Sequence, residues 1–325
     1  MKSARRLFVT AAIAGALAAT LGAAQAQTAT AYPTKPITVV VSYPPGGDTD
    51  AIARLFADKL SQSMQQPIVV ENKPGAAGII GTEFVAKAPA DGYTVLIGQS
   101  GALAVNPYLY KLNFDPQKDL APVTLLITGA TVMATSAESP YKSVRDFITV
   151  AKKDPGKLTY ASYGAGHISH LIGEMFKAYA GIDIVHVPYK SGPLPDVIAG
   201  RVDVIFEGTA VAVPQINAGR MRALAVMGAK RSPGLPNVPS VAEDLPGFDA
   251  PGWVGVMVPA GTPQPIVDRL NKEFNAALAS PDVRQKIAGM LLEPTGNSPQ
   301  EFGAFIRNQS ERWGKVIREA NIKGD

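Results

Sequence analysis

Short runs rich in β-branched residues alternate along this chain with longer stretches in which apolar residues recur every three or four positions. The run ITVVV at 37–41, for example, is followed by a stripe through Ile52, Phe56, Leu60 and Met64. Apolar residues at this spacing form one face of a helix, whereas short β-branched runs are typical of strands. Such an alternation predicts an α/β fold made of βαβ units around a mainly parallel sheet.

The alternation starts afresh near Leu120, which indicates a second α/β unit. A segment rich in proline and glycine at 230–252 follows that unit, and two amphipathic helices close the chain, one through 267–278 and one through 302–317. These last helices can pack back on the first unit, so we expect two lobes around a cleft. The expected boundaries are 27–123 plus 256–325 for lobe I and 124–255 for lobe II.

The first 26 residues have the three parts of a secretory signal peptide. Lys2, Arg5 and Arg6 precede an apolar run at 7–21, and Ala24-Gln25-Ala26 then forms an A-x-A cleavage site. The apolar run is shorter than the roughly 20 residues that a membrane-spanning helix needs. No later stretch is long and apolar enough to be one. We expect a periplasmic protein cleaved after Ala26, exported by the general or the twin-arginine route, between which the Arg-Arg pair does not decide.

Little net charge remains once the expected leader is set aside. The chain has 31 basic and 27 acidic residues, and three of the basic ones lie in the leader, which leaves 28 bases against 27 acids. Without a basic run there is no electrostatic basis for binding nucleic acid. Cysteine is absent, which excludes disulfides, thiol nucleophiles and thiolate metal sites.

Three turns rich in small residues follow strand-like runs. They are Pro44-Pro45-Gly46-Gly47, Pro74-Gly75-Ala76-Ala77-Gly78 and Ser162-Tyr163-Gly164-Ala165-Gly166. Open α/β sheets bind ligands at the carboxyl ends of their strands, and glycine lets backbone N–H groups come close to a ligand. The helix after each turn adds positive potential at its N-terminus. Each turn therefore suits an oxyanion, although each could also be a tight turn without a ligand.

Nucleotide and enzyme motifs are missing. Neither Gly156-Lys157 nor Gly314-Lys315 is followed by Ser or Thr as in a P-loop, and no stretch fits G-x-G-x-x-G or G-x-S-x-G. His167 and His170 lie three apart, but neither a third ligand nor an H-E-x-x-H motif completes a zinc site. We expect no catalytic residue, metal or cofactor, and a carboxylate ligand rather than a nucleotide phosphate. A secreted hydrolase is the least favoured alternative.

Several longer stretches occur in a characteristic order: YPTKPITVVVSYPPGGDTDAIAR, ENKPGAAGIIGTEFVAKAPADGYTVLIG, NPYLY, DLAPVTLL, HVPYK and KRSPGLPNVPSVAE. Together they resemble the Bug receptors, the extracytoplasmic solute-binding proteins of tripartite tricarboxylate transporters. The resemblance implies a type II periplasmic binding protein that closes two lobes over a small organic carboxylate, such as a dicarboxylate, a tricarboxylate or an aromatic acid. It implies delivery to the membrane subunits of a transporter, and we expect a monomer. A receptor that docks on a membrane sensor is the alternative.

In that family the turns after the first two strands grip one carboxylate, partly through ordered waters, and the second lobe selects the rest of the ligand. The grip then falls on Pro45, Gly46 and Gly47 opposite Gly75–Gly78, and Asp50 is expected as a helix N-cap or first-turn acid with a structural role. The full set of candidate ligand-binding residues is Tyr43, Pro45, Gly46, Gly47, Asp48, Gly75, Ala76, Ala77, Gly78, Ser100, Ser162, Tyr163, Gly164, Gly166, His167, His170, Glu207, Gly208 and Thr209.

Three of these residues depart from the family pattern. Asp48 stands where a small residue is usual, and its carboxylate would repel an anionic ligand, so it either points to solvent or meets a cationic or protonated group. His167 replaces a usual Ser or Thr, and Tyr163 is larger than the usual Ser or Gly. Both could donate to a second carboxylate or flank a flat ring, or one of them packs against the turn. The loop at 190–196 also looks shorter than in the family, so its cleft contacts are open.

Overall fold

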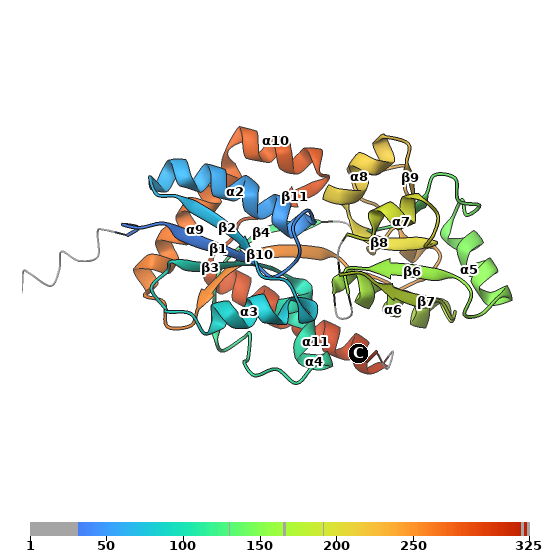
Figure 1. Ribbon diagram of the computed structural model, residues 1–325, viewed down its shortest axis with the longest axis horizontal. Coiled ribbons are helices and arrows are strands. Elements are labelled where there is room, and N and C mark those ends of the chain that lie inside the picture. Colours follow the sequence, from blue (N-terminus) through green and yellow to red (C-terminus); the bar gives the residue numbers. More distant parts are fainter. Residues whose placement is uncertain (1–31, 130, 165–166, 191, 320–321, 324–325) are drawn as a thin grey trace, which may run out of the picture. The chain divides into compact units, whose positions relative to one another are not determined.

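The computed structural model describes residues 32–129, 131–164, 167–190, 192–319 and 322–323 (Figure 1). The expected leader with its cleavage site and the candidate residue Gly166 lie outside these ranges. Residues 36–325 form one unit, which is the part discussed below. Within the described ranges, no helix combines the length and the apolar character that a membrane span requires.

The first sheet combines parallel and antiparallel strands. Its spatial order is β11 (Leu292–Pro294), β4 (Leu120–Gly129), β10 (Gly252–Pro259), β3 (Thr94–Gln99), β1 (Ile37–Val41) and β2 (Ile68–Asn72). β1 pairs in parallel with β2 and β3, whereas β10 is antiparallel to β3 and β4. The sheet is thus mixed rather than mainly parallel, because the chain leaves it through β4 and returns through β10 in the opposite direction.

Helices cover both faces of this sheet (Figure 1). On one face, α2 (Asp48–Met64) packs on α9 (Gln264–Ala279) through the rings of Phe56 and Phe274, whose centroids lie 5.7 Å apart. On the other face lie α3 (Ile79–Ala86) and α11 (Pro299–Glu319), and Phe302 of α11 joins the core around Trp253. Because both faces are covered, β1 is apolar nearly throughout instead of alternating.

The second sheet has the spatial order β7 (Val185–Pro188), β6 (Thr159–Ser162), β8 (Val204–Gly208), β5 (Thr131–Ser136) and β9 (Met221–Val226). It is mixed as well, since β6 is parallel to β7 and β8 while β5 is antiparallel to β8 and β9. One core contains side chains of α5 (Val144–Lys153) and α6 (Ile168–Ala180), and a second contains side chains of α7 (Leu194–Ile198) and α8 (Thr209–Asn217). The two-lobed α/β fold expected from the sequence is confirmed.

The strand pairings indicate where the chain crosses from one lobe to the other. All of β4 and β10 belongs to the first sheet, and the expected boundaries at 123/124 and 255/256 fall inside these two strands. We propose crossovers at 129–131 and 250–252 instead. A third connection is α11, since Trp313 and Ile317 near its end lie in the core of the second lobe.

Several short elements have no counterpart among the expected ones. They are α4 (Asn106–Leu109), α8, α10 (Pro281–Gly289), β11, the 3₁₀ turns at Ala76–Gly78 and Val241–Glu243, and a π-helical stretch at Gly101–Val105. Each is only one to three turns long or, for β11, three residues. Elements this short contain too few apolar positions to show a period.

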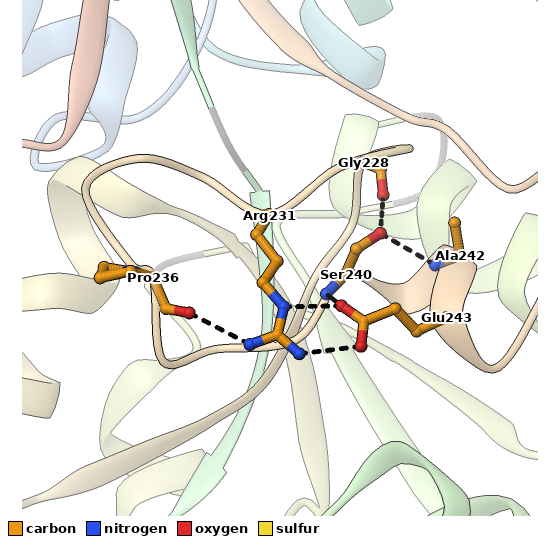
Figure 2. A network of polar contacts seen from close by, with 6 residues as sticks. All are labelled: Gly228, Arg231, Pro236, Ser240, Ala242 and Glu243. Atoms are coloured by element: carbon orange, nitrogen blue, oxygen red, sulfur yellow. Dashed lines mark hydrogen bonds and ion pairs between the residues drawn. The ribbon is translucent and has the colours of Figure 1, made fainter.

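The proline-rich segment between β9 and β10 buries Val241, Phe248 and Ala250 in the core of the second lobe, and polar side chains also hold it in place. Ser240 and Glu243 form a capping box, and the two carboxylate oxygens of Glu243 accept from Nε and Nη2 of Arg231 at 2.8 Å each (Figure 2). Arg231 also donates to the carbonyl of Pro236. The Arg231 side chain, followed by the Ser240 backbone, holds the pKa of Glu243 at about 2.

Candidate functional site

A cavity of about 70 Å³ lies where the two sheets meet. Its lining comes from the segments that follow β1 and β6, from the ends of β3 and β8, and from the crossover strands. The carboxyl ends of strands from both lobes therefore converge on one space, which is where open α/β sheets bind ligands.

Three helices begin at this cavity. The N-cap residues of α2, α6 and α8 are Gly47, His167 and Gly208, and all three line it. Helix N-termini carry positive potential and unsatisfied N–H groups, so each favours an anion. No lysine or arginine is among the described residues of the lining. The positive potential available to a ligand here comes from backbone dipoles.

The turn after β1 is held in place by Asp50 of α2. Its Oδ2 accepts from the backbone N–H of Gly46 and from Nε of Arg54, both at 3.0 Å, and its Oδ1 accepts from Nδ2 of Asn72 at 3.0 Å. The sequence left open whether Asp50 is the N-cap of this helix or an acid in its first turn. Gly47 is the N-cap, so Asp50 is the first-turn acid. Burial alone would raise the pKa of Asp50, but the hydrogen bonds from Arg54, Gly46 and Asn72 lower it below the usual range of an aspartate. One ionised side chain links β1, α2 and β2.

The turn after β2 has an unusual backbone. Its four residues from Gly75 to Gly78 all have positive φ, including Ala76 at 45° and Ala77 at 55°, a region that non-glycine residues rarely adopt. The carbonyl of Ala77 accepts from Nδ2 of Asn106 at 3.0 Å and from the Tyr43 hydroxyl at 3.4 Å. The turn therefore packs behind Tyr43 rather than lining the cavity.

His167 contacts both lobes. Its Nδ1 accepts from the backbone N–H of Ser169 at 3.1 Å, which caps α6. Its Nε2 lies 3.2 Å from Nε2 of Gln99 at the end of β3, and its ring meets the Tyr43 ring edge-on at 4.9 Å. Burial, with a smaller contribution from His170, lowers the pKa of His167 to about 3. A neutral imidazole thus bridges the lobes.

Asp48 does not point to solvent. As the first residue of α2 it crosses to the other lobe, where a Cβ on Gly208 would overlap its carboxylate and the N–H of Val211 in α8 donates to it. Burial raises the pKa of Asp48 to about 7. Burial, and then the neighbouring charge of Asp48, raises the pKa of Glu207 to about 8. Two carboxyl groups from different lobes therefore share one buried region.

Tyr163 completes this group. Its hydroxyl donates to Oε2 of Glu207 at 2.7 Å, and the backbone N–H of Gly208 donates to Oε1 at 3.0 Å. Burial, followed by the charge of Glu207, raises the pKa of Tyr163 far above its usual value, so the phenol stays protonated. Glu207 is therefore fixed in orientation at the end of β8.

The candidate residues from the sequence fall into two groups. Those that line the cavity are Tyr43, Gly47, Asp48, Tyr163, His167, Glu207 and Gly208. Those described but outside its lining are Pro45, Gly46, Gly75, Ala76, Ala77, Gly78, Ser100, Ser162, Gly164, His170 and Thr209. Ser162 bonds to His186 at 2.6 Å, and His170 stacks on the His186 ring, so the loop behind the cavity is a packed histidine cluster. Within the described ranges, no three His, Cys, Asp or Glu side chains are grouped to hold a metal.

Sequence reasoning missed other lining residues, among them Gln99, Thr131 and Trp253. Gln99 is the last residue of β3, directly before the candidate Ser100, and the position at a strand end was the signal that could have found it. Thr131 and Trp253 lie beside the crossovers between the sheets. Their place in the site depends on the lobes meeting, which local periodicity does not encode.

Comparison with known proteins agrees with this architecture. A family model described as "Tripartite tricarboxylate transporter family receptor" matches residues 52–322. BugT of Bordetella pertussis is 37% identical over 317 residues, which cover 96% of this chain and 97% of BugT. The structure of Rpa4515 from R. palustris with adipate has 37% identity and a TM-score of 0.86, covering 90% of this chain and 99% of that one.

MatC from Rhodopseudomonas palustris with bound malate has 31% identity and a TM-score of 0.84, covering 88% of this chain and 100% of MatC. A relative above 30% identity that is matched over nearly its whole length, together with a family model matched over most of the chain, is sufficient to assign membership. The chain therefore belongs to the receptor family of the tripartite tricarboxylate transporters, a family of solute-binding receptors and not of enzymes.

Proposed function

We propose that this protein is a periplasmic receptor that captures a small organic carboxylate between its two lobes and delivers it to a tripartite tricarboxylate transporter. The observation that carries the proposal is the convergence of three helix N-termini on one cavity without a basic side chain among its described lining residues. Backbone N–H groups and helix dipoles suit a carboxylate. The adipate and malate bound by Rpa4515 and MatC support the same ligand class.

Capture by lobe closure follows from where the lining residues lie. Gly47 and Asp48 precede or begin α2 in the first lobe, whereas Glu207 and Gly208 end β8 in the second. A solute that contacts both sets gains its full binding energy only when the lobes meet, so it stabilises the closed state. An affinity on the order of micromolar corresponds to roughly 8 kcal/mol, which a few backbone amides in a closed cleft can supply.

Thermal-shift screening of the protein purified after export tests the ligand class. The panel contains mono-, di- and tricarboxylates, aromatic acids and amino acids, with sugars and divalent metals as controls. A ligand that binds only the folded state raises the melting temperature, by the equivalent of about 2.7 kcal/mol at one hundred times its Kd. At least one carboxylate should do so. A sugar or a metal that raises it while every carboxylate fails would refute the proposal.

Delivery is tested in cells. Deleting the gene should abolish uptake of the carboxylate found in the screen, and a copy encoding Gly47→Val should not restore it. Uptake that persists without the protein, while a transcriptional response to the same carboxylate is lost, would favour the sensory role over transport.

A further inference from the structure

Three carboxylic acids line the cavity, but only one of them has a basic partner. Asp50 pairs with Arg54 and accepts from Asn72. Within the described residues, no lysine or arginine forms an ion pair with Asp48 or Glu207. The cavity therefore contains two acids without a matching cation, at the place where the lobes meet.

One oxygen of this pair is without a hydrogen-bond partner. Oδ1 of Asp48 is shielded from solvent and has no hydrogen-bond partner in the described part of the protein. The carboxyl group of Asp48 has one donor, the backbone N–H of Val211. A buried acceptor that lacks a donor is costly. Both oxygens of Glu207 have a donor, in Tyr163 and Gly208, but a carboxylate oxygen can accept a second hydrogen bond. Around this acid pair, acceptor positions therefore remain for a donor on the ligand.

Resting on the proposed function, we propose that the solute carries an ammonium group in addition to its carboxylate, and that this ammonium lies between the carboxyl groups of Asp48 and Glu207. The carboxylate then lies against the helix N-termini, next to the turn at Gly46–Gly47. The solute is a small zwitterion of the amino acid class. A plain dicarboxylate would instead place a second negative charge beside Asp48 and Glu207, which is unfavourable once those acids are ionised.

The other ionisable groups around the pair do not supply a cation. Tyr43, at the end of β1, and Tyr163 remain protonated and neutral because burial raises the pKa of each. His167 remains neutral because burial lowers its pKa. On the α2 side, the charge of Arg54 is matched by Asp50, and on the α6 side His170 lies outside the cavity lining, with its ring stacked on Tyr160 and His186. The ammonium of a ligand is therefore the cation that the pair can bind.

The test compares ligands that differ only in the ammonium group. Calorimetric titration of the exported protein with aspartate against succinate, and with glutamate against glutarate, measures the preference directly. At about pH 8.5, where Asp48 and Glu207 are mostly ionised, the amino compound of at least one pair should bind about tenfold more tightly or better. At about pH 6 the two acids are mostly protonated, and the preference should shrink.

Two isosteric variants locate the effect. Asp48→Asn and Glu207→Gln should each reduce the preference to about threefold or less, and Asp48→Asn should improve the binding of the plain dicarboxylate. Glu311→Gln, on an exposed residue of α11, is the matched control and should leave the preference unchanged. Melting temperatures show that each variant is folded.

The outcomes separate this inference from the proposed function. Equal binding of amino and plain dicarboxylates at both pH values, or a preference that survives in both variants, overturns the inference while carboxylate binding stands. Tight binding of a diamine that has no carboxylate would support the ammonium site and overturn the carboxylate receptor. No binding of any of these probes or of the carboxylate panel overturns both.

Discussion

The adjacent residues Gly46 and Gly47 are both glycine, but a side chain would interfere with a different feature at each position. Gly46 has a φ of 89°, which side chains rarely adopt, so its lack of a Cβ serves the backbone. Gly47 has a φ of −87°, which any residue can adopt, and a Cβ there would have no neighbour within 4 Å. The open space beside Gly47 belongs to the cavity that it lines. What a side chain would obstruct there is the approach of a ligand.

Gly47→Val should therefore abolish solute binding and leave the fold largely intact. The valine side chain occupies the space in front of the first turn of α2, so the carboxylate cannot reach the backbone N–H groups. Circular dichroism and the melting temperature check the fold, and calorimetry checks binding. Retained affinity in a folded Gly47→Val protein would mean that the ligand binds elsewhere.

At the scale of elements, Asp50 connects more structure than any motif suggested. Its carboxylate holds the Gly46 turn, and Asn72 of β2 donates both to it and to the carbonyl of Tyr43 at 3.1 Å. The end of β1, the start of α2 and the end of β2 are thus fixed relative to one another, and the turn that borders the cavity is fixed with them.

Asp50→Ala should lower the free energy of unfolding by about 2 kcal/mol, because the hydrogen bonds of its buried carboxylate with Gly46, Arg54 and Asn72 are lost. It should also weaken solute binding, because the turn is no longer held. Asp58→Ala, at an exposed position of the same helix, is the control and should change stability by no more than about 0.5 kcal/mol. Urea denaturation and calorimetry measure the two effects, and an Asp50→Ala protein as stable as the control would contradict the structural role.

Gly255 in β10 determines how closely α11 packs on the first sheet. A Cβ at this position would overlap the ring of Phe302, which is fully buried. Gly255→Ala should cost about 1–3 kcal/mol of stability, since neither the strand nor the ring can move freely. Gly289→Ala in α10, where a Cβ meets nothing within 4 Å, should leave stability unchanged or raise it slightly. Similar denaturation midpoints for the two variants would show that Phe302 or β10 can shift to accommodate the added methyl group at little cost.

At the scale of the whole protein, the proposed lobe closure should depend on pH through the acid pair. The pKa values of Asp48 and Glu207 are raised by burial where the lobes meet, so this arrangement binds more protons than an open one would, in which both acids are in water. The stability that protonation of Asp48 and Glu207 gives to this arrangement is greatest below the ordinary carboxyl pKa near 4. It is lost as the pH rises through their raised values of about 7 and 8. Closure without a ligand should therefore be favoured at low pH and opposed at high pH.

The melting temperature of the ligand-free protein should accordingly fall between about pH 6 and about pH 9. Asp48→Asn removes one of the two charges, so its fall over the same interval should be clearly smaller. Small-angle scattering should show a larger radius of gyration at the higher pH for the natural protein. A fall of equal size in the natural protein and in Asp48→Asn would mean that the pair does not control closure.

Local patterns in the sequence were sufficient for much of the fold. The β-branched run at 37–41 and the stripe from Ile52 to Met64 formed β1 and α2, because period and residue type decide which face of an element is buried. The same patterns could not show that both sheets are mixed. Strand direction depends on where the chain crosses between lobes, and that is a property of the assembled sheets.

The sequence by itself determined that Asp48 follows a glycine turn at the start of a helix, and that Glu207 ends a strand-like run. Only the tertiary structure decided that the two acids meet. Asp48 reaches the first turn of α8, a helix too short to leave a periodic signal, and it approaches the backbone closely because Gly208 has no side chain there. A residue's neighbours along the chain fix its backbone, but the charge state and partners of Asp48 are set by the residues of the other lobe that it contacts.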